Sequence, residues 1–198
     1  QTGFGRTGVL FACDREGVTP DIITLSKALG AGVVPVSLSV TTPGVWKRAF
    51  GTRERFDMTI STFGGNPAAC AAALKTIEIV LRDDLAGRAA ELGRHARGRL
   101  ERLRARHPQI LSIRGEGLLL GVQFAPQHVP GGHATEDYTG LVISRLLNKH
   151  GILTSYCDLD PSVLRFEPPL VVTKGQIDAA VDAIDEVLGH GVGGLALS

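Results

Sequence analysis

The sequence is poor in cysteine and in net charge, and each scarcity excludes a class of protein. Three cysteines occur among 198 residues, at Cys13, Cys70 and Cys157, and no CxxC pair is present. Their odd number and wide spacing give neither a disulfide framework nor a zinc site, which is typical of a reducing, cytoplasmic compartment. A net charge of +1 argues against general electrostatic attraction to nucleic acid or acidic membranes.

The sequence also lacks an uninterrupted apolar run. Residues 22–40 have nearly the length of a membrane span, but they contain Lys27, Pro35 and several small residues. We therefore expect a strand, a turn and a second strand there. We see no signal-peptide pattern. Hydrophobic residues make up 43% of the chain and charged residues 21%, which allows a packed core and argues against wholesale disorder.

The chain begins at Gln1 with a dense glycine loop and no methionine. We expect it to be the C-terminal part of a longer protein.

The spacing of apolar residues and the positions of glycine, proline and helix-capping residues predict two structural parts. The first contains helices at 9–15 and 43–50, two strands within 21–40, a loop at 51–61, and a long helical region at 68–106 that bends near Asp83–Asp84 or Gly87. The second is a small α+β unit with strands at 110–114, 118–124, 152–156 and 163–166, helices at 138–150 and 174–188, a loop at 127–137 and a tail at 189–198.

Lys27 is the most informative residue, because it follows a short β-branched strand and precedes a run of small residues. A lysine there lies either at a loop surface, with its stem over apolar neighbours, or in a dry cleft at the end of the strand. Desolvation disfavours the ammonium form, and a neutral amine can attack a carbonyl. The second alternative would suit a Schiff base to an aldehyde cofactor.

A second motif, residues 61–67 (Ser-Thr-Phe-Gly-Gly-Asn-Pro), combines hydroxyls and glycines with a helix start. Asn66 and Pro67 are favoured N-cap and first-turn residues. Free N–H groups at such a terminus favour a phosphate, although a well-capped helix is the simpler interpretation.

A third motif places Arg165 inside an apolar strand that precedes two prolines, in the sequence Val-Leu-Arg-Phe-Glu-Pro-Pro-Leu at 163–170. The planar guanidinium suits a carboxylate, and a surface arginine on an edge strand is the alternative.

With the glycine loop Gln1–Gly8, these motifs resemble those of class III aminotransferases, which are fold-type I pyridoxal-phosphate enzymes. The resemblance extends from Gln1 to about Leu188 and is strongest at 1–8, 20–32, 62–67 and 165–170. It implies an α/β fold: the end of a large cofactor-binding domain at 1–75, a linking helix at 76–107, a small α+β domain at 108–190 and a tail at 191–198.

The resemblance also implies a role for four residues. Lys27 would carry pyridoxal 5'-phosphate as a Schiff base and move the proton at the substrate Cα. Thr62 would bind the cofactor phosphate across a homodimer interface, and Gln1 would hydrogen-bond the hydroxyl of the cofactor ring. Arg165 would hold the α-carboxylate of an amino-acid substrate.

The implied reaction moves an amino group from an amino acid, a diamine or an ω-amino acid to a 2-oxo acid. The family's aspartate at the pyridine nitrogen would lie just upstream of Gln1, so we expect the isolated chain to be inactive. Aminomutase, racemase or decarboxylase chemistry on the same lysine remains an alternative, and so does a non-catalytic remnant.

Two other features have simpler explanations. The arginine-rich stretch 94–106 is better explained as a solvated helix face than as a nucleic-acid stripe, because the net charge is balanced. His128 and His133 flank a Pro-Gly-Gly turn in no recognisable metal-binding pattern, so we expect no metal site.

Overall fold

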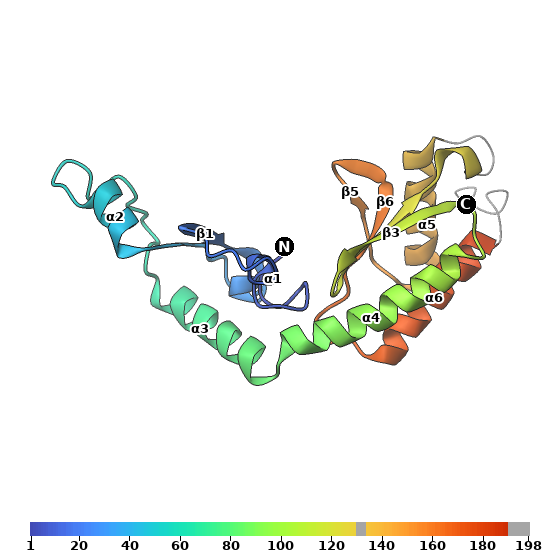
Figure 1. The fold of residues 1–198 in the computed structure, drawn as a ribbon, viewed down its shortest axis with the longest axis horizontal. Coiled ribbons are helices and arrows are strands. Elements are labelled where there is room, and N and C mark those ends of the chain that lie inside the picture. Colours follow the sequence, from blue (N-terminus) through green and yellow to red (C-terminus); the bar gives the residue numbers. More distant parts are fainter. Residues whose placement is uncertain (130–133, 190–198) are drawn as a thin grey trace. The chain divides into compact units, whose positions relative to one another are not determined.

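The computed structural model describes residues 1–129 and 134–189 of the chain. It divides into two compact units, Gln1–Ala86 and Gly87–Ser198, which are called unit 1 and unit 2 below (Figure 1). The domain boundaries expected at residues 75, 107 and 190 stay predictions. His133 and the expected tail beyond Gly189 lie outside the described residues.

Unit 1 is built on two antiparallel strands that flank the lysine turn. Strands β1 (Ile22–Leu25) and β2 (Leu38–Thr41) pair from Ile22↔Thr41 to Leu25↔Leu38. Between them lies the short 3-10 helix η1 (Lys27–Gly30). The expected strand, turn and strand across this apolar stretch are therefore confirmed, and among the described residues no helix is long and apolar enough to cross a membrane.

Three α-helices complete unit 1. They are α1 (Ala12–Arg15), α2 (Pro43–Phe50) and α3 (Pro67–Arg82). The expected helices at 43–50 and from Pro67 onwards are confirmed. The helix expected at 9–15 is shorter, because the residues before Ala12 pair with the glycine loop. Leu10 accepts a hydrogen bond from the Gly5 N–H, and Phe11 forms a β-bridge with Gly3.

The long helical region breaks where the sequence predicts a break. Helix α3 ends at Arg82, and α4 runs over Leu85–Arg104. Asp84 between them has a φ of 43°, which no α-helix accommodates. The left-handed residue therefore ends one helix and lets a second begin.

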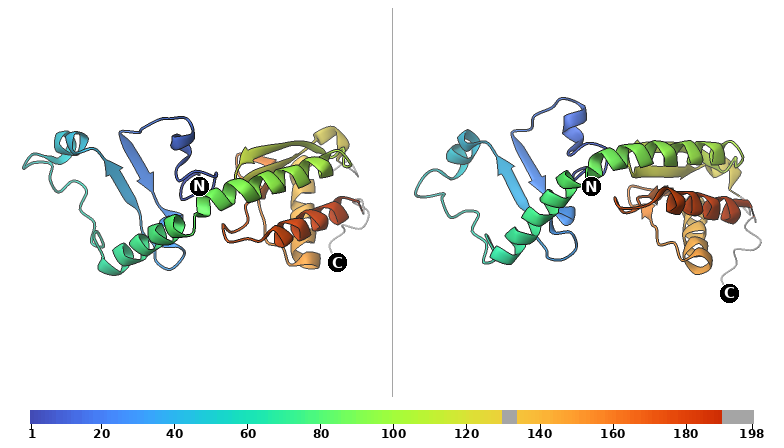
Figure 2. Two further views of the ribbon diagram at one scale, coloured as in Figure 1. Left: turned by 60° about the horizontal axis from the view of Figure 1, so that its bottom comes forward. Right: turned by 90° about the horizontal axis from the view of Figure 1, so that it is seen from below.

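Unit 2 is a four-stranded antiparallel sheet with three helices. The strands follow the order β3-β4-β6-β5, and burial alternates along β4, so one face of the sheet is covered. The core draws on α4, α5, α6 and the three longer strands (Figure 2). The bounds are β3 Ile110–Glu116, β4 Leu119–Phe124, α5 Thr135–His150, β5 Tyr156–Cys157, β6 Asp160–Phe166 and α6 Lys174–Gly189, with a 3-10 turn η2 at Pro126–His128.

The turn between β3 and β4 depends on glycine. Gly115 has a φ of 119°, and a Cβ there would lie 1.9 Å from the Leu119 carbonyl oxygen. On α4, a Cβ at Gly93 would lie 2.2 Å from the Gly117 carbonyl oxygen. Glycine at these places therefore allows the helix and the turn to approach each other closely.

The strand expected at 152–156 is wrong for all but its last residue. The Ile152 N–H donates to the Leu146 carbonyl and so helps to close the end of α5 after Gly151, whose φ is 65°. A register irregularity between Tyr156 and Cys157 shortens the pairing with β6 further. Apolar β-branched character at Ile152 favoured a strand, but closing the helix required its N–H group.

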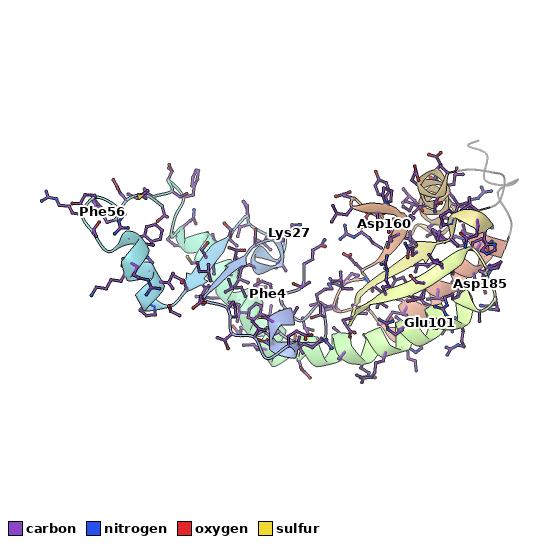
Figure 3. All side chains as sticks on the ribbon, turned by 45° about the horizontal axis from the view of Figure 1, so that its top comes forward. Phe4, Lys27, Phe56, Glu101, Asp160 and Asp185 are labelled. Carbon is purple, nitrogen blue, oxygen red and sulfur yellow. The ribbon has the colours of Figure 1, made fainter. Side chains whose placement is uncertain are left out.

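Ion pairs connect α4 to α6 within unit 2. His95 Nε2 lies 2.6 Å from Asp178 Oδ1, and Arg99 Nη1 lies 3.3 Å from the same oxygen. Just beyond the C-terminal end of α4, His107 Nε2 lies 2.6 Å from Asp185 Oδ1, and Arg106 reaches the second oxygen of that carboxylate at 2.7 Å. The arginine-rich stretch is therefore partly paired with α6, and this row of contacts is called the α4–α6 seam below. Asp185 of the seam is labelled in Figure 3.

Candidate functional site

Lys27 lies at the start of a turn with an unusual backbone conformation. It follows Ser26 at the end of β1 and begins η1, with a φ of 50°. For a residue with a side chain, the left-handed region costs about 1–2 kcal/mol. Such strain is often stored at functional positions. Phe4, Ala31 and Asp84 also have a positive φ, so the backbone conformation alone does not distinguish Lys27.

The turn is anchored by its neighbour Leu29. This side chain is fully buried in a small cluster with Phe4 and Ala73, and Val36 and Ile77 pack against it. Because Leu29 is held from one side by the glycine loop and from the other by α3, the backbone around Lys27 is fixed. The strained residue is thus carried on an anchored turn.

The Lys27 side chain is exposed in this chain. Within residues 1–129 and 134–189 it forms no hydrogen bond and no ion pair. Of the two environments that the sequence left open, the surface of a turn is the one observed here. The physical reason is the two-stranded sheet beside it, where Ile22 and Val40 are 57% and 46% exposed; too little chain covers this sheet to make a dry cleft.

The glycine loop joins this turn through one aromatic residue. Phe4 is buried, has a φ of 53° and meets Phe11 edge to face with ring centroids 5.9 Å apart. The Thr2 carbonyl accepts from the Ala12 N–H at 3.1 Å, which ties the loop to α1. Gln1 is exposed at the open end of the loop. Phe4 and Lys27 are labelled in Figure 3.

Thr62 lies in the turn that leads into α3 and is exposed. Asn66 caps the helix: its side-chain oxygen accepts from the N–H groups of Ala68 at 2.9 Å and Ala69 at 3.2 Å. Two donors of the first turn are thereby taken, which agrees with the simpler interpretation of this motif. A phosphate here would rely on the Thr62 hydroxyl and on loop N–H groups before the helix.

Three of the four motifs are therefore brought into unit 1. The glycine loop and the lysine turn share the cluster of Phe4, Leu29 and Ala73, and the Thr62 turn leads directly into the helix that carries Ala73. The fourth motif, around Arg165, belongs to unit 2. Gln1, Lys27, Thr62 and Arg165 keep their expected roles as predictions.

Arg165 lies in β6 opposite Gly121 of β4. Its backbone is fixed on the other side by Ser155, whose carbonyl accepts from the Arg165 N–H at 2.9 Å, and by the Thr154 hydroxyl, which donates to the Arg165 carbonyl at 2.5 Å. The side chain borders an apolar groove of about 570 Å³ between β6 and α6. Leu164, Pro169, Ile177 and Ile184 are among the residues that line it.

The guanidinium of Arg165 already holds a carboxylate. Its Nε donates to Glu167 Oε1 at 2.8 Å and its Nη2 donates to Glu167 Oε2 at 2.6 Å. This hydrogen-bonded pairing with Glu167 raises the pKa of Arg165 above its ordinary value. Glu167 was not among the residues predicted from the sequence. Residues two apart on an extended strand point to the same side, so the Arg-Phe-Glu spacing carried the signal.

No group of three or more histidine, cysteine or acidic side chains is placed to hold a metal ion in the described part of the chain. Cys13, Cys70 and Cys157 are free thiols.

Comparison with known proteins assigns a family. The family model described as Aminotransferase class-III matches residues 1–188. Ornithine aminotransferase 2 of Staphylococcus aureus is 37% identical over 195 residues, which cover 94% of this chain and 42% of the relative. Putrescine aminotransferase of Pectobacterium atrosepticum is 38% identical over 189 residues, which cover 95% of this chain and 38% of that relative.

A solved ornithine aminotransferase from Toxoplasma gondii matches with a TM-score of 0.83 and 34% identity, covering 100% of this chain and 43% of that one. The chain thus spans less than half the length of these relatives. The predicted fold class, part of a fold-type I transferase with α/β architecture, is confirmed by this likeness. The chain belongs to the class-III aminotransferase family.

Proposed function

We propose that the protein containing this chain is a pyridoxal-phosphate-dependent transaminase that moves an amino group from an amino acid, a diamine or an ω-amino acid to a 2-oxo acid. The observation that carries the proposal is the state of Lys27: an exposed amine without a partner in the described residues, on a strained turn anchored by Leu29. Family membership supports the same reaction. The T. gondii relative is described as holding PLP at its active site with partial occupancy.

The residues of unit 1 fit this cofactor. Lys27 would bind its aldehyde carbon as a Schiff base, since the ε-amine is not engaged by any described carboxylate. Gln1 would hydrogen-bond the ring hydroxyl, and the Thr62 hydroxyl would donate to the phosphate of the cofactor bound by the partner subunit; both side chains are exposed. The cofactor, when bound, supplies an electron sink for negative charge at the substrate Cα.

The remaining chemistry falls to the protein. The Lys27 amine would take the proton from the substrate Cα as a general base. In its protonated form it would then donate that proton as a general acid. An ammonium cannot accept that proton, so the complete protein must cover the surface that is open here and favour the neutral amine. Arg165 would orient substrates through their carboxylate with its planar fork.

We further propose that the protein is a homodimer in which Thr62 acts on the partner's cofactor. Every residue from 51 to 68 is exposed in this chain. Within this segment Phe56 and Phe63 are 62% and 79% exposed, and Met58 and Ile60 are 69% and 74% exposed. Apolar side chains gathered in this way are typical of a surface that another chain covers.

The first experiment tests Lys27 in the complete protein. Reduction with borohydride should fix pyridoxal phosphate on Lys27, and a peptide map locates the label. Lys27→Ala should lose the label. Its rate of amino transfer to 2-oxoglutarate should fall by at least about 10³-fold, because the amine that binds the cofactor and moves the proton has been removed. Lys75→Ala is the matched control, since Lys75 is an exposed lysine of the same unit, paired with Glu78 at 2.7 Å.

An unlabelled Lys27 or near-normal transfer by Lys27→Ala would refute the proposal. Product analysis with a panel of donors separates transfer from aminomutase, racemase or decarboxylase chemistry, because only transfer consumes the 2-oxo acid. We also propose that the 198-residue chain alone is inactive, and measurable turnover by it would contradict this.

A further inference from the structure

We propose that Arg97 closes the exposed edge of β3 to strand pairing and so keeps two copies of this protein from joining their sheets. The surface concerned is the longer edge of the four-stranded sheet in unit 2. The partner that Arg97 excludes is the β3 strand of a second copy of the chain. This role is independent of the proposed transaminase reaction.

The sheet has two edge strands, and β3 is the longer one. It has β4 on one side, and no strand lies on its other side within the described residues of unit 2. In an antiparallel pair, every second residue directs its N–H and C=O groups away from the neighbouring strand. Such an edge offers donors and acceptors to a strand of another chain. The opposite edge, β5, offers far less, because it has only two residues and an irregular register.

Arg97 of α4 occupies two acceptors on this edge. Its Nη1 donates to the Ile113 carbonyl at 3.2 Å, and its Nη2 donates to the Gly115 carbonyl. These two residues are two apart on the strand, so their carbonyls point to the same side of β3. Because Arg97 lies outside the sheet, this side is the one that another chain would approach. The planar guanidinium presents parallel donors, which suit two successive carbonyls of one edge.

The face of α4 that carries Arg97 is held against β3. Gly93 lies one turn earlier on the same face, and a Cβ there would lie 2.2 Å from the Gly117 carbonyl oxygen in the turn after β3. Ala96 and Leu100 are fully buried in the core of unit 2. These contacts fix the rotation of α4 about its axis, so Arg97 is placed beside the edge of β3.

The first part of the edge is protected in another way. The pairing of β3 with β4 is irregular between Ile110 and Ser112, and a bulge of this kind bends a strand and increases its twist. From Ser112 to Glu116 the pairing is regular, so this part is the better template for another strand. Arg97 covers it. An incoming strand must displace a charged guanidinium from both carbonyls.

A second copy of the chain fits this part of the edge. Two copies of β3 related by a two-fold axis pair antiparallel, and each presents the same row of donors and acceptors. When such a pair is centred on Gly115, Arg114 of one copy lies opposite Glu116 of the other. Opposite charges in this cross-strand position stabilise a sheet. The sequence of the edge therefore favours self-pairing, and the Arg97 contacts oppose it.

The test compares variants of the complete protein over a series of concentrations. Arg97→Met keeps an unbranched side chain and removes the donors. Arg94→Met is the charge-matched control, because it removes an arginine from an exposed position of the same helix. Sedimentation measures association beyond the wild-type state, and hydrogen exchange resolved by peptide follows residues 110–116.

Arg97→Met should raise the association constant by about tenfold or more, because two carbonyls become free to accept hydrogen bonds from a second copy. Exchange over residues 110–116 should slow as the concentration rises, since amides of the edge gain partners. Arg94→Met should behave as the wild type. Arg97→Lys should lie between the two, because an ammonium is a point charge without the planar fork.

A loss of stability alone gives a different result: exchange over β3 becomes faster and does not depend on concentration. A double variant, Arg97→Met with Leu111→Lys, adds a lysine at a half-exposed position of the edge strand. This charge should block pairing again and restore the wild-type state of association. If Arg97→Met does not fold, Arg97→Lys decides by the same measurements.

Association of Arg97→Met no stronger than that of Arg94→Met would overturn the inference. Association that leaves exchange over residues 110–116 unchanged would do the same, and so would association that the added lysine does not reduce.

Discussion

The two units of this chain bury their apolar residues to very different extents. In unit 2 a continuous core joins α4, α5 and α6 to β3, β4 and β6, and side chains such as Leu100, Phe124 and Val142 are fully buried. In unit 1 the core cluster consists of Phe4, Leu29 and Ala73, with a few partly buried neighbours. The unit that carries Lys27 thus has the smaller core of its own.

The two units therefore differ in how much stability their own apolar side chains can supply. Unit 1 leaves Ile60, Phe63 and Leu74 at 74%, 79% and 68% exposure, although each side chain would gain about 1.5–3 kcal/mol by full burial. Unit 2 leaves Leu153, Leu159 and Val171 exposed as well, but it also buries a continuous apolar core within its own residues. We infer that unit 2 draws more of its stability from its own core than unit 1 does.

The sharpest test of this comparison truncates one leucine in each unit of the 198-residue chain. Leu100→Ala removes a fully buried side chain of α4 and should destabilise unit 2 by about 3 kcal/mol, through lost burial and the cavity left behind. Leu74→Ala, at 68% exposure on α3, should change the stability of unit 1 by less than about 0.5 kcal/mol. Hydrogen exchange resolved by peptide measures both units separately. Equal losses of stability in the two variants would contradict the predicted difference between the units.

A second prediction concerns the anchor of the lysine turn. Leu29→Ala should cost about 2 kcal/mol locally, because the small cluster with Phe4 and Ala73 loses its largest aliphatic member. Amide exchange should then accelerate over residues 22–30. Val33→Ala, at 76% exposure beyond the same turn, serves as the control. Unchanged protection in Leu29→Ala would mean that the turn is held by other contacts.

Much of the fold follows from local patterns in the sequence. Pro43 and the Asn66–Pro67 pair mark helix starts because cap and first-turn chemistry depend on residues within a few positions. The two strands around Lys27 follow from β-branched runs interrupted by small residues. These signals need no knowledge of distant chain segments, and the structure agrees with them.

The features that the sequence mispredicted or left open depend on contacts between distant segments. Residues 152–155 have the sequence pattern of a strand, but the Ile152 N–H donates to a carbonyl at the end of α5. Whether this hydrogen bond forms depends on how the helix packs. The exposure of Lys27 is likewise a property of what covers β1 and β2, and its own neighbours in the sequence do not determine it. The Arg165–Glu167 pair was within reach of the sequence, yet the spacing alone does not show which carboxylate the arginine binds.

The Asn66 cap gives a third and smaller prediction. Asn66→Ala should destabilise the first turn of α3 by about 1 kcal/mol, because the N–H groups of Ala68 and Ala69 lose their acceptor. Asn66→Asp should keep the acceptor and add a charge that the helix N-terminus favours. Exchange rates at residues 68–70 measure the effect. Equal rates in the two variants would show that the cap does not stabilise α3.

The smallest expected effect concerns the α4–α6 seam: its carboxylates should make the stability of unit 2 fall at acidic pH. Burial opposes the ionisation of Asp185, but hydrogen bonds from His107 and Arg106 outweigh it and lower its pKa below 3.8. At the other end of the seam, the hydrogen bond from His95 lowers the pKa of Asp178, with further help from the charges of His95, Arg99 and Lys174. Both ionised carboxylates therefore stabilise unit 2.

The sign of the pH dependence follows. A folded pKa below the unfolded value means that the stabilisation is complete above the unfolded value near 3.8 and is lost as the pH falls through the lower folded pKa. Asp185→Asn should cost about 0.5 kcal/mol at pH 7 and flatten the acid side of the stability curve. Glu91→Gln, an exposed carboxylate change on α4, should leave the curve unchanged. Urea unfolding of unit 2 between pH 2 and pH 7 measures this, and an acid limb as steep in Asp185→Asn as in the wild type would mean that the seam does not link the stability of unit 2 to pH.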